Sequence, residues 1–199
     1  MMDLHLLPAL TLFAFVTSIT PGPNNMMLMA SGANFGMRRT LPHMLGVAIG
    51  FVIMAMLVGV GLIEVFDRFP VIYDVLKWGG IAYMLWLAFK IGTQEPKVPE
   101  PNAKARPITF LQACAFQWVN PKAWSMALNA ITLYTADRSW AGIALVGIVF
   151  GAVNLPSVAV WAFLGQQMRR FLTSTTRLRA FNITMAVLLV LTLIPVLWH

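Results

Sequence analysis

The chain contains a stretch from Leu6 to Met37 in which no side chain is ionisable. A straight helix of this length would measure about 48 Å, whereas the hydrocarbon core of a bilayer is about 30 Å thick. The stretch is therefore too apolar for an ordinary water-soluble helix and too long for one straight span. Its sequence predicts a membrane-spanning helix that is interrupted at residues 20–25, which read Thr-Pro-Gly-Pro-Asn-Asn.

Five further apolar stretches follow, each about long enough for one span. They cover residues 40–63, 71–89, 108–135, 139–168 and 180–199. The segment 93–107 is rich in proline and charge, which indicates a cytoplasmic linker. The sequence therefore predicts an all-α polytopic membrane protein with six transmembrane helices. Asn154-Leu155-Pro156 predicts a further break within the fifth span.

Charged residues are scarce, and their placement excludes several classes of protein. Only 11% of the residues are charged, against about 25% in an ordinary globular domain. The formal net charge of +7 could suggest nucleic acid, but the basic residues lie in short gaps between apolar stretches and form no basic face. A soluble enzyme and a nucleic-acid-binding protein are therefore excluded. We find no catalytic motif, no metal-binding motif and no cofactor motif, because the three histidines are scattered and there is one cysteine.

The distribution of lysine and arginine predicts the orientation in the membrane. Ten of these residues follow the first, third and fifth spans, whereas the opposite side holds three, Arg68, Lys77 and Arg138. Since cytoplasmic loops are enriched in lysine and arginine, both termini are expected in the periplasm. The one remaining basic residue is Lys122, which lies within the fourth span.

Two features recur at nearly the same offset along the chain. Pro21 and Pro121 lie 100 residues apart, and the pairs Gly46/Gly50 and Gly147/Gly151 are offset by 101 residues. The four glycines are typical of close helix packing in membranes. The offset predicts two three-helix repeats, 1–92 and 108–199, joined by the linker 93–107. An odd number of spans in each repeat gives the two halves opposite orientations, as in many secondary transporters.

The two helix breaks suggest a binding site. Each proline frees backbone groups, which in hydrocarbon must face protein or a water-filled cavity. Lys122 is the only charge deep within a long apolar run, so it could be a fixed cation for a substrate carboxylate, with Asn120 adding hydrogen bonds. Two other interpretations stay open: a kink repaired by neighbouring helices, and a lysine that extends to the membrane interface.

The chain resembles the LysE/RhtB family of amino-acid exporters of the bacterial inner membrane. The resemblance covers nearly the whole chain and is carried by Thr-Pro-Gly-Pro-Asn at 20–24, Asn-Pro-Lys-Ala at 120–123, and the stretch from Leu76 to Leu87. It departs from the family pattern at Thr40 and Ala113, where glycine is usual. It implies export of an amino acid or a small derivative, driven by the proton gradient.

The expected partners are an amino acid as substrate, the lipid bilayer, protons as coupling ion and a second copy of the chain in a homodimer. No cofactor, metal or nucleic acid is expected. The candidate substrate-binding residues are Thr20, Pro21, Gly22, Pro23, Asn24, Asn25, Gln117, Asn120, Pro121, Lys122 and Asn154. Two alternatives to a transporter are a small-solute channel and a non-transporting membrane assembly partner.

Overall fold

A computed structural model describes residues 6–62, 64, 68–69, 71–93, 106–135 and 139–194. These residues are all-helical and contain no strand. The helices are α1 (Leu7–Ile19), α2 (Pro23–Phe35), α3 (Met37–Leu57) with its π-helical continuation η2 (Val58–Leu62), α5 (Val71–Gly92), α6 (Phe110–Gln117), α7 (Pro121–Tyr134), α8 (Trp140–Met168) and α9 (Thr175–Leu191).

The first predicted break is confirmed between α1 and α2. Thr20 is extended (φ −66°, ψ 148°), because the proline that follows it disfavours helical backbone. Gly22 is also extended (φ −179°, ψ 176°), and Pro23 then occupies the first turn of α2, where its missing N–H costs nothing.

The second predicted break is confirmed between α6 and α7. A capping box formed by Thr109 and Gln112 starts α6, which ends after only eight residues. Asn120 then caps α7, since its side-chain oxygen accepts a hydrogen bond from the backbone N–H of Lys122 at 3.1 Å. Pro121 lies in the first turn of α7, as Pro23 does in α2.

Two sequence predictions are wrong. The break expected at Asn154-Leu155-Pro156 is absent, because α8 runs continuously through Pro156. An interior proline removes a single ladder hydrogen bond, and tight packing of α8 against its neighbours supports the helix past that point. The last helix begins at Thr175 instead of residue 180, because Ser174 caps it by accepting from the N–H of Arg177 at 3.2 Å.

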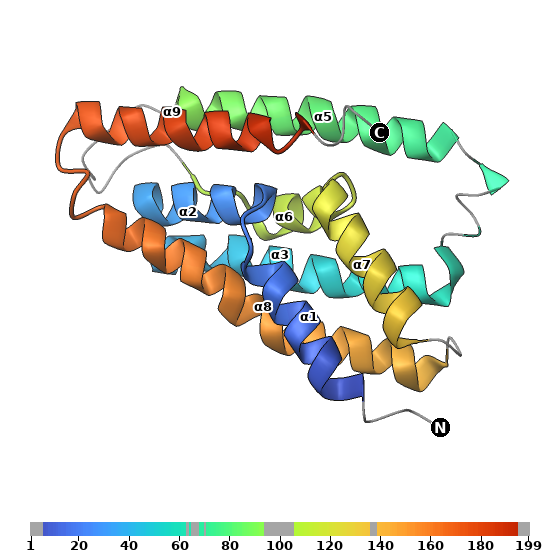
Figure 1. Ribbon diagram of the computed structural model, residues 1–199. Coiled ribbons are helices and arrows are strands. Elements are labelled where there is room, and N and C mark those ends of the chain that lie inside the picture. Colours follow the sequence, from blue (N-terminus) through green and yellow to red (C-terminus); the bar gives the residue numbers. More distant parts are fainter. Residues whose placement is uncertain are drawn as a thin grey trace.

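Among the described residues, the helices pack around three apolar cores. In Figure 1, α5 and α9 lie side by side across the top of the view, above α2 and α6. One apolar core joins α5 and α9 to α2 and α6 through residues such as Met84, Phe116 and Leu189. A second core joins α1, α3, α7 and α8 around Phe51 and Phe150, whose ring centroids are 4.9 Å apart.

Glycines set the closest helix contacts. A Cβ atom added to Gly32 on α2 would overlap the carbonyl oxygen of Ala162 on α8, and one added to Gly165 would overlap that of Met29. This α2–α8 crossing was not predicted, because its two glycines lie on different helices. Gly46 and Gly50 lie against α6, so that a Cβ on Gly50 would be 2.7 Å from the Cα atom of Cys114.

The other predicted glycine pair lies in a looser contact. Gly147 and Gly151 face Met56 and Val52 of α3, with a Cβ on Gly151 3.6 Å from the nearest side-chain atom. Together with Ile49 and Ile148, they line an open apolar groove between α3 and α8.

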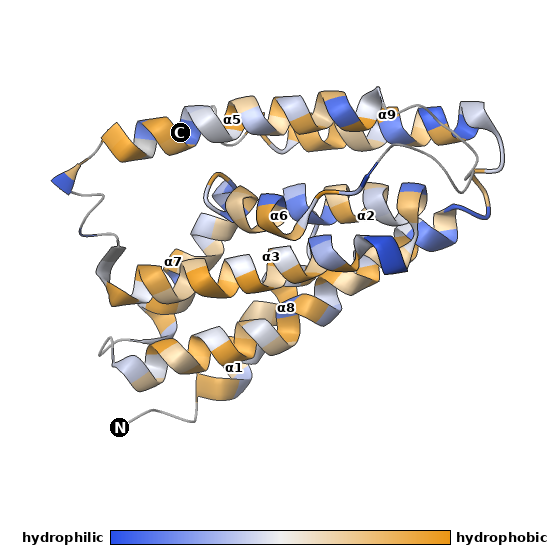
Figure 2. Cartoon of the chain, turned by 180° about the vertical axis from the view of Figure 1, so that it is seen from behind, coloured by the Kyte–Doolittle hydropathy of each residue, from blue (hydrophilic) through white to orange (hydrophobic). Residues whose placement is uncertain are grey.

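Large apolar side chains point outward on most helices. Figure 2 shows hydrophobic residues along much of α3, α7 and α8. Leu111 is 74% exposed, Trp140 is 75% exposed and Ile148 is 69% exposed. Such a surface is unfavourable in water but matches the hydrocarbon of a membrane.

Within the described residues, two single helices are long and apolar enough to cross a membrane, Met37–Gly61 and Trp140–Met168. The first and fourth predicted spans are each divided into two shorter helices, and α9 has 17 residues. The arrangement of six spans in two inverted repeats therefore stays a prediction. Most of the linker (94–105) and both chain ends lie outside the described residues.

Candidate functional site

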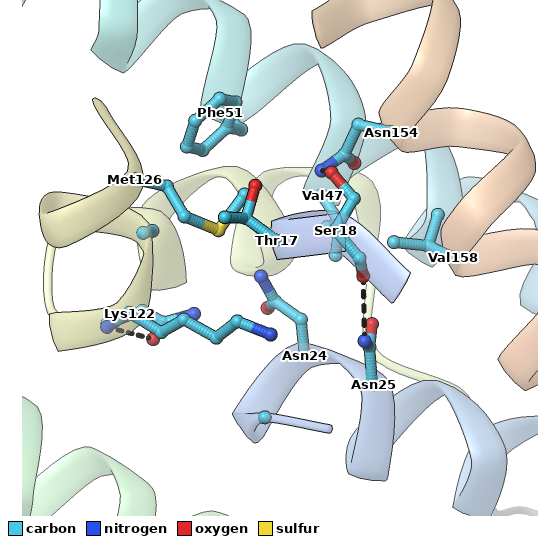
Figure 3. A pocket seen from close by; sticks show the side chains of 13 residues that line it. Thr17, Ser18, Asn24, Asn25, Val47, Phe51, Lys122, Met126, Asn154 and Val158 are labelled. Atoms are coloured by element: carbon cyan, nitrogen blue, oxygen red, sulfur yellow. Dashed lines mark hydrogen bonds between the residues drawn. The ribbon is translucent and has the colours of Figure 1, made fainter. Parts of the chain in front are cut away.

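Lys122 connects the two helix breaks. Its side chain extends from the first turn of α7 toward the end of α1 and the start of α2 (Figure 3). The Nζ atom donates hydrogen bonds to the carbonyl oxygen of Thr20 at 2.6 Å, the hydroxyl of Thr20 at 3.0 Å and the carbonyl oxygen of Pro21 at 3.3 Å. Residues 101 and 102 positions apart are thereby held together at one point.

The close approach of Lys122 depends on a glycine. A Cβ atom at position 22 would lie 2.6 Å from Cδ and 3.2 Å from Nζ of Lys122. Any larger residue there would push the lysine away from the end of α1. The Pro-Gly-Pro sequence thus supplies both the helix break and the space for the cation.

The ammonium group of Lys122 has only neutral acceptors. The acceptors are two backbone carbonyls and one hydroxyl, and none of the carboxylates within the described residues forms an ion pair with it. The side chain is half-buried, and a lysine cation within a membrane costs about 2.5–3.5 kcal/mol. Its positive charge is therefore not neutralised, and the site favours an anionic ligand.

An amide pair joins the two breaks a second time. The Nδ2 atom of Asn24 on α2 donates to Oε1 of Gln117 on α6 at 2.8 Å, and Nε2 of Gln117 donates back to Oδ1 of Asn24 at 3.3 Å. Gln117 is fully buried and also donates to the carbonyl of Ala113 at 2.8 Å. These bonds hold the start of α2 next to the end of α6.

Asn25 compensates for the backbone groups freed at the end of α1. Its Nδ2 atom donates to the carbonyl oxygens of Ser18 at 2.9 Å and Thr20 at 2.7 Å. The indole N–H of Trp161 on α8 likewise donates to the carbonyl of Ile19 at 2.9 Å. Part of the first break is thus repaired by neighbouring helices, as one of the open interpretations expected.

Asn154 presents an unused acceptor. Its Nδ2 atom donates to the hydroxyl of Ser18 at 3.2 Å, but its Oδ1 atom is buried and has no hydrogen-bond partner within the described part of the chain. A buried acceptor without a partner costs about 1–3 kcal/mol. The side chain lies on α8, beside the same cavity that Lys122 reaches from α7.

This cavity is lined from five helices and is small. Its volume is about 20 Å³, which is enough for about one water molecule. Figure 3 shows Lys122, Asn24, Asn25 and Asn154 converging on it with Thr17 and Ser18. Gly22 and Asn120 line it as well. The prediction missed Thr17 and Ser18, whose signal is a polar pair in the last turn of an otherwise apolar helix.

A much larger groove lies on the other side of the breaks. Its volume is about 710 Å³, and it is bounded by the breaks, by α7 and by α5. Pro21, Gly22, Pro23 and Pro121 line it, and Lys122 lines both the groove and the small cavity. Two predicted residues line neither space: Thr20 holds Lys122 through hydrogen bonds, and Gln117 pairs with Asn24.

Comparison with known proteins identifies relatives of this chain. A family model described as LysE type translocator matches residues 15–194. The chain is 31% identical over 189 residues to the cysteine/O-acetylserine efflux proteins of Escherichia coli (strain K12) and Shigella flexneri. These matches cover 93% of this chain and 94% of each relative. No solved structure matches the chain.

Proposed function

This chain belongs to the LysE type translocator family, and we propose that it exports a small amino acid or amino-acid derivative across the bacterial inner membrane. Members of the family are amino-acid efflux transporters in a membrane and not enzymes. The relatives are named for efflux of cysteine and O-acetylserine, which both carry an α-carboxylate and an α-amino group. Either compound is a reasonable first substrate to test.

The observation that carries the proposal is that the Lys122 cation has no anionic partner among the described residues. A substrate carboxylate at Lys122 would supply the missing negative charge and would compete with the carbonyls of Thr20 and Pro21 for its N–H groups. The carbonyl oxygens of Thr20 and Pro21 that Lys122 releases could then accept hydrogen bonds from the substrate ammonium. Such a site binds a zwitterion through neutral dipoles and one fixed cation.

The packing of the helices supports the inverted-repeat part of the proposal. The α6 helix packs along α3, as α1 packs along α8. If α1 corresponds to α6 and α3 to α8, the two contacts are equivalent under a two-fold axis. In this arrangement the six spans form the repeats 1–92 and 108–199, both termini are periplasmic, and the breaks meet near the axis, as in other transporters with broken helices.

The test is exchange transport by the purified protein in lipid vesicles. Vesicles loaded with unlabelled cysteine or O-acetylserine should accumulate the labelled compound, and the rate should saturate. We expect Lys122→Met, which removes the charge at nearly constant length, to lower exchange about 10–100-fold, the loss expected for a charged hydrogen bond. Lys90→Met is the matched control, because Lys90 is exposed on α5 beside Trp86. Wild-type exchange by Lys122→Met would exclude the role given to Lys122.

The same assay distinguishes the alternatives and the driving force. A channel would show flux that neither saturates nor responds to internal substrate, and a non-transporting assembly partner would show no flux. Proton coupling predicts that an imposed pH gradient drives accumulation and that a protonophore abolishes it. Cross-linking in native membranes tests the proposed homodimer.

A further inference from the structure

We infer that the groove between α5 and α7 receives the substrate's side chain and selects uncharged, apolar side chains through Trp118, Trp124 and Leu128. The inference rests on the proposed function, since it assumes that the substrate carboxylate binds Lys122. It goes further, because neither the family nor the relatives assign a side-chain pocket to this chain.

Size determines on which side of Lys122 the substrate lies. Small-molecule sites typically have volumes of about 300–1,000 Å³. The groove falls within this range at about 710 Å³, whereas the polar cavity of about 20 Å³ is far too small for an amino acid. Lys122 is the cation common to both spaces, so a carboxylate bound to it places the rest of the substrate in the groove.

Part of the groove wall is aromatic and apolar. The rings of Trp118 and Trp124 meet edge to face, with centroids 6.2 Å apart and an interplanar angle of 69°. The indole N–H of Trp124 donates to the carbonyl of Trp118 at 2.8 Å, which fixes the ring and engages its polar atom. Leu128 extends this wall by one turn of α7, and Met84 of α5 lines the groove as well.

The charges of the groove disfavour basic side chains. Its described lining contains two cations, Lys122 and Lys77, and no aspartate or glutamate. Once the substrate carboxylate occupies Lys122, a second positive charge on the substrate would still face Lys77 without a counter-ion. Burial of an ammonium group under these conditions is unfavourable. The apolar wall therefore favours aliphatic over basic substrates.

The experiment measures KM along a series of substrates in the vesicle exchange assay: alanine, 2-aminobutyrate, norvaline and norleucine. If each methylene is buried against the wall, KM should fall by about fourfold per added methylene. Lysine differs from norleucine by its terminal ammonium group, and we expect at least a tenfold higher KM for lysine. A KM that is constant along the series would overturn the inference, as would a preference for lysine or glutamate.

Substitutions in the groove wall test whether its residues select the substrate's side chain. Leu128→Ser should flatten the dependence of KM on side-chain length, because it removes apolar surface from the wall. Leu133→Ser is the matched control on the same helix, because Leu133 is 58% exposed and does not line the groove. Trp124→Phe provides a second variant if Leu128→Ser fails to fold, and it should raise KM for norleucine more than for alanine. An unchanged slope in a folded variant of either kind would contradict the inference.

The outcomes separate this inference from the proposed function. If alanine exchange requires Lys122 but KM does not respond to side-chain length, the side-chain pocket is wrong and the transporter stands. If no amino acid is exchanged at all, the proposed function itself fails.

Discussion

The Nζ atom of Lys122 lies 2.6 Å from the carbonyl oxygen of Thr20, so a cation on the first turn of α7 is bound at the C-terminal end of α1. Helix C-termini carry partial negative charge on their free carbonyls, which favours a cation there. The interaction also connects the two halves of the chain through residues 102 positions apart. A substrate carboxylate that competes for this ammonium would therefore act on the contact between the halves.

The contact between Gly22 and Lys122 makes a steric prediction. Gly22→Ala places a methyl group 2.6 Å from the lysine Cδ, so the ammonium should move away from Thr20 and exchange transport should fall at least tenfold. The φ of Gly22 is −179°, so the loss would come from this clash and not from backbone strain. Gly79→Ala is the control, because nothing lies within 4 Å of a Cβ at that position. Equal exchange rates in the two variants would contradict the close contact.

The α2–α8 crossing predicts a large loss of stability from a single methyl group. Gly165→Ala would drive its Cβ into the backbone carbonyl of Met29, and overpacking of this kind costs about 1–3 kcal/mol or more. The unfolding temperature in detergent should therefore fall by several degrees, as measured by tryptophan fluorescence. Gly151→Ala, whose nearest neighbour is 3.6 Å away, should leave it nearly unchanged. Unfolding of both variants at the wild-type temperature would contradict the close contact between Gly165 and Met29.

The amide pair predicts energetic coupling between the two breaks. Asn24→Ala and Gln117→Ala each leave one amide without its partner. The losses of stability in the two single variants should therefore add up to more than the loss in the double variant. We expect a coupling energy of about 0.5–3 kcal/mol in a double-mutant cycle on unfolding in detergent. Pairing Asn24→Ala with Asn129→Ala is the control, because Asn129 is exposed and bonds only to the carbonyl of Ser125. Additive effects for Asn24 and Gln117 would show that the pair does not link the breaks.

Replacement of His43 is expected to stabilise the protein, whereas the substitutions above weaken transport or stability. The side chain of this α3 residue is fully buried, and neither ring nitrogen has a hydrogen-bond partner among the residues that the structure describes. His43→Leu therefore removes unsatisfied polar atoms and breaks no hydrogen bond, so it should raise the free energy of unfolding by about 1 kcal/mol. Thermal unfolding in detergent and the exchange assay together check this. A variant that folds normally but no longer exchanges substrate would instead indicate that His43 takes part in transport.

Several features of the site could be predicted from the sequence, because they depend on the chemistry of individual residues and their neighbours along the chain. Pro21 and Pro121 disfavour helical backbone at the residues before them, Thr20 and Asn120, which are extended, and Asn120 is a strong N-cap. Lys122 was conspicuous because a charge in a long apolar run is costly. Pro156 shows the limit of the same reasoning: a proline stops a helix only where packing does not support its continuation, and α8 is packed along α2, α3 and α1.

The sequence by itself determined that the chain consists of long apolar helices with two breaks a hundred residues apart, since hydrophobicity and missing N–H groups are properties of individual residues. Only the tertiary structure decided which groups meet across those breaks. Hydrogen bonds and close contacts act over a few ångströms, so the binding of Lys122 to Thr20 and the pairing of Asn24 with Gln117 depend on how separate helices pack. The same is true of the tight crossing at Gly32 and Gly165, which no spacing within a single helix could have indicated.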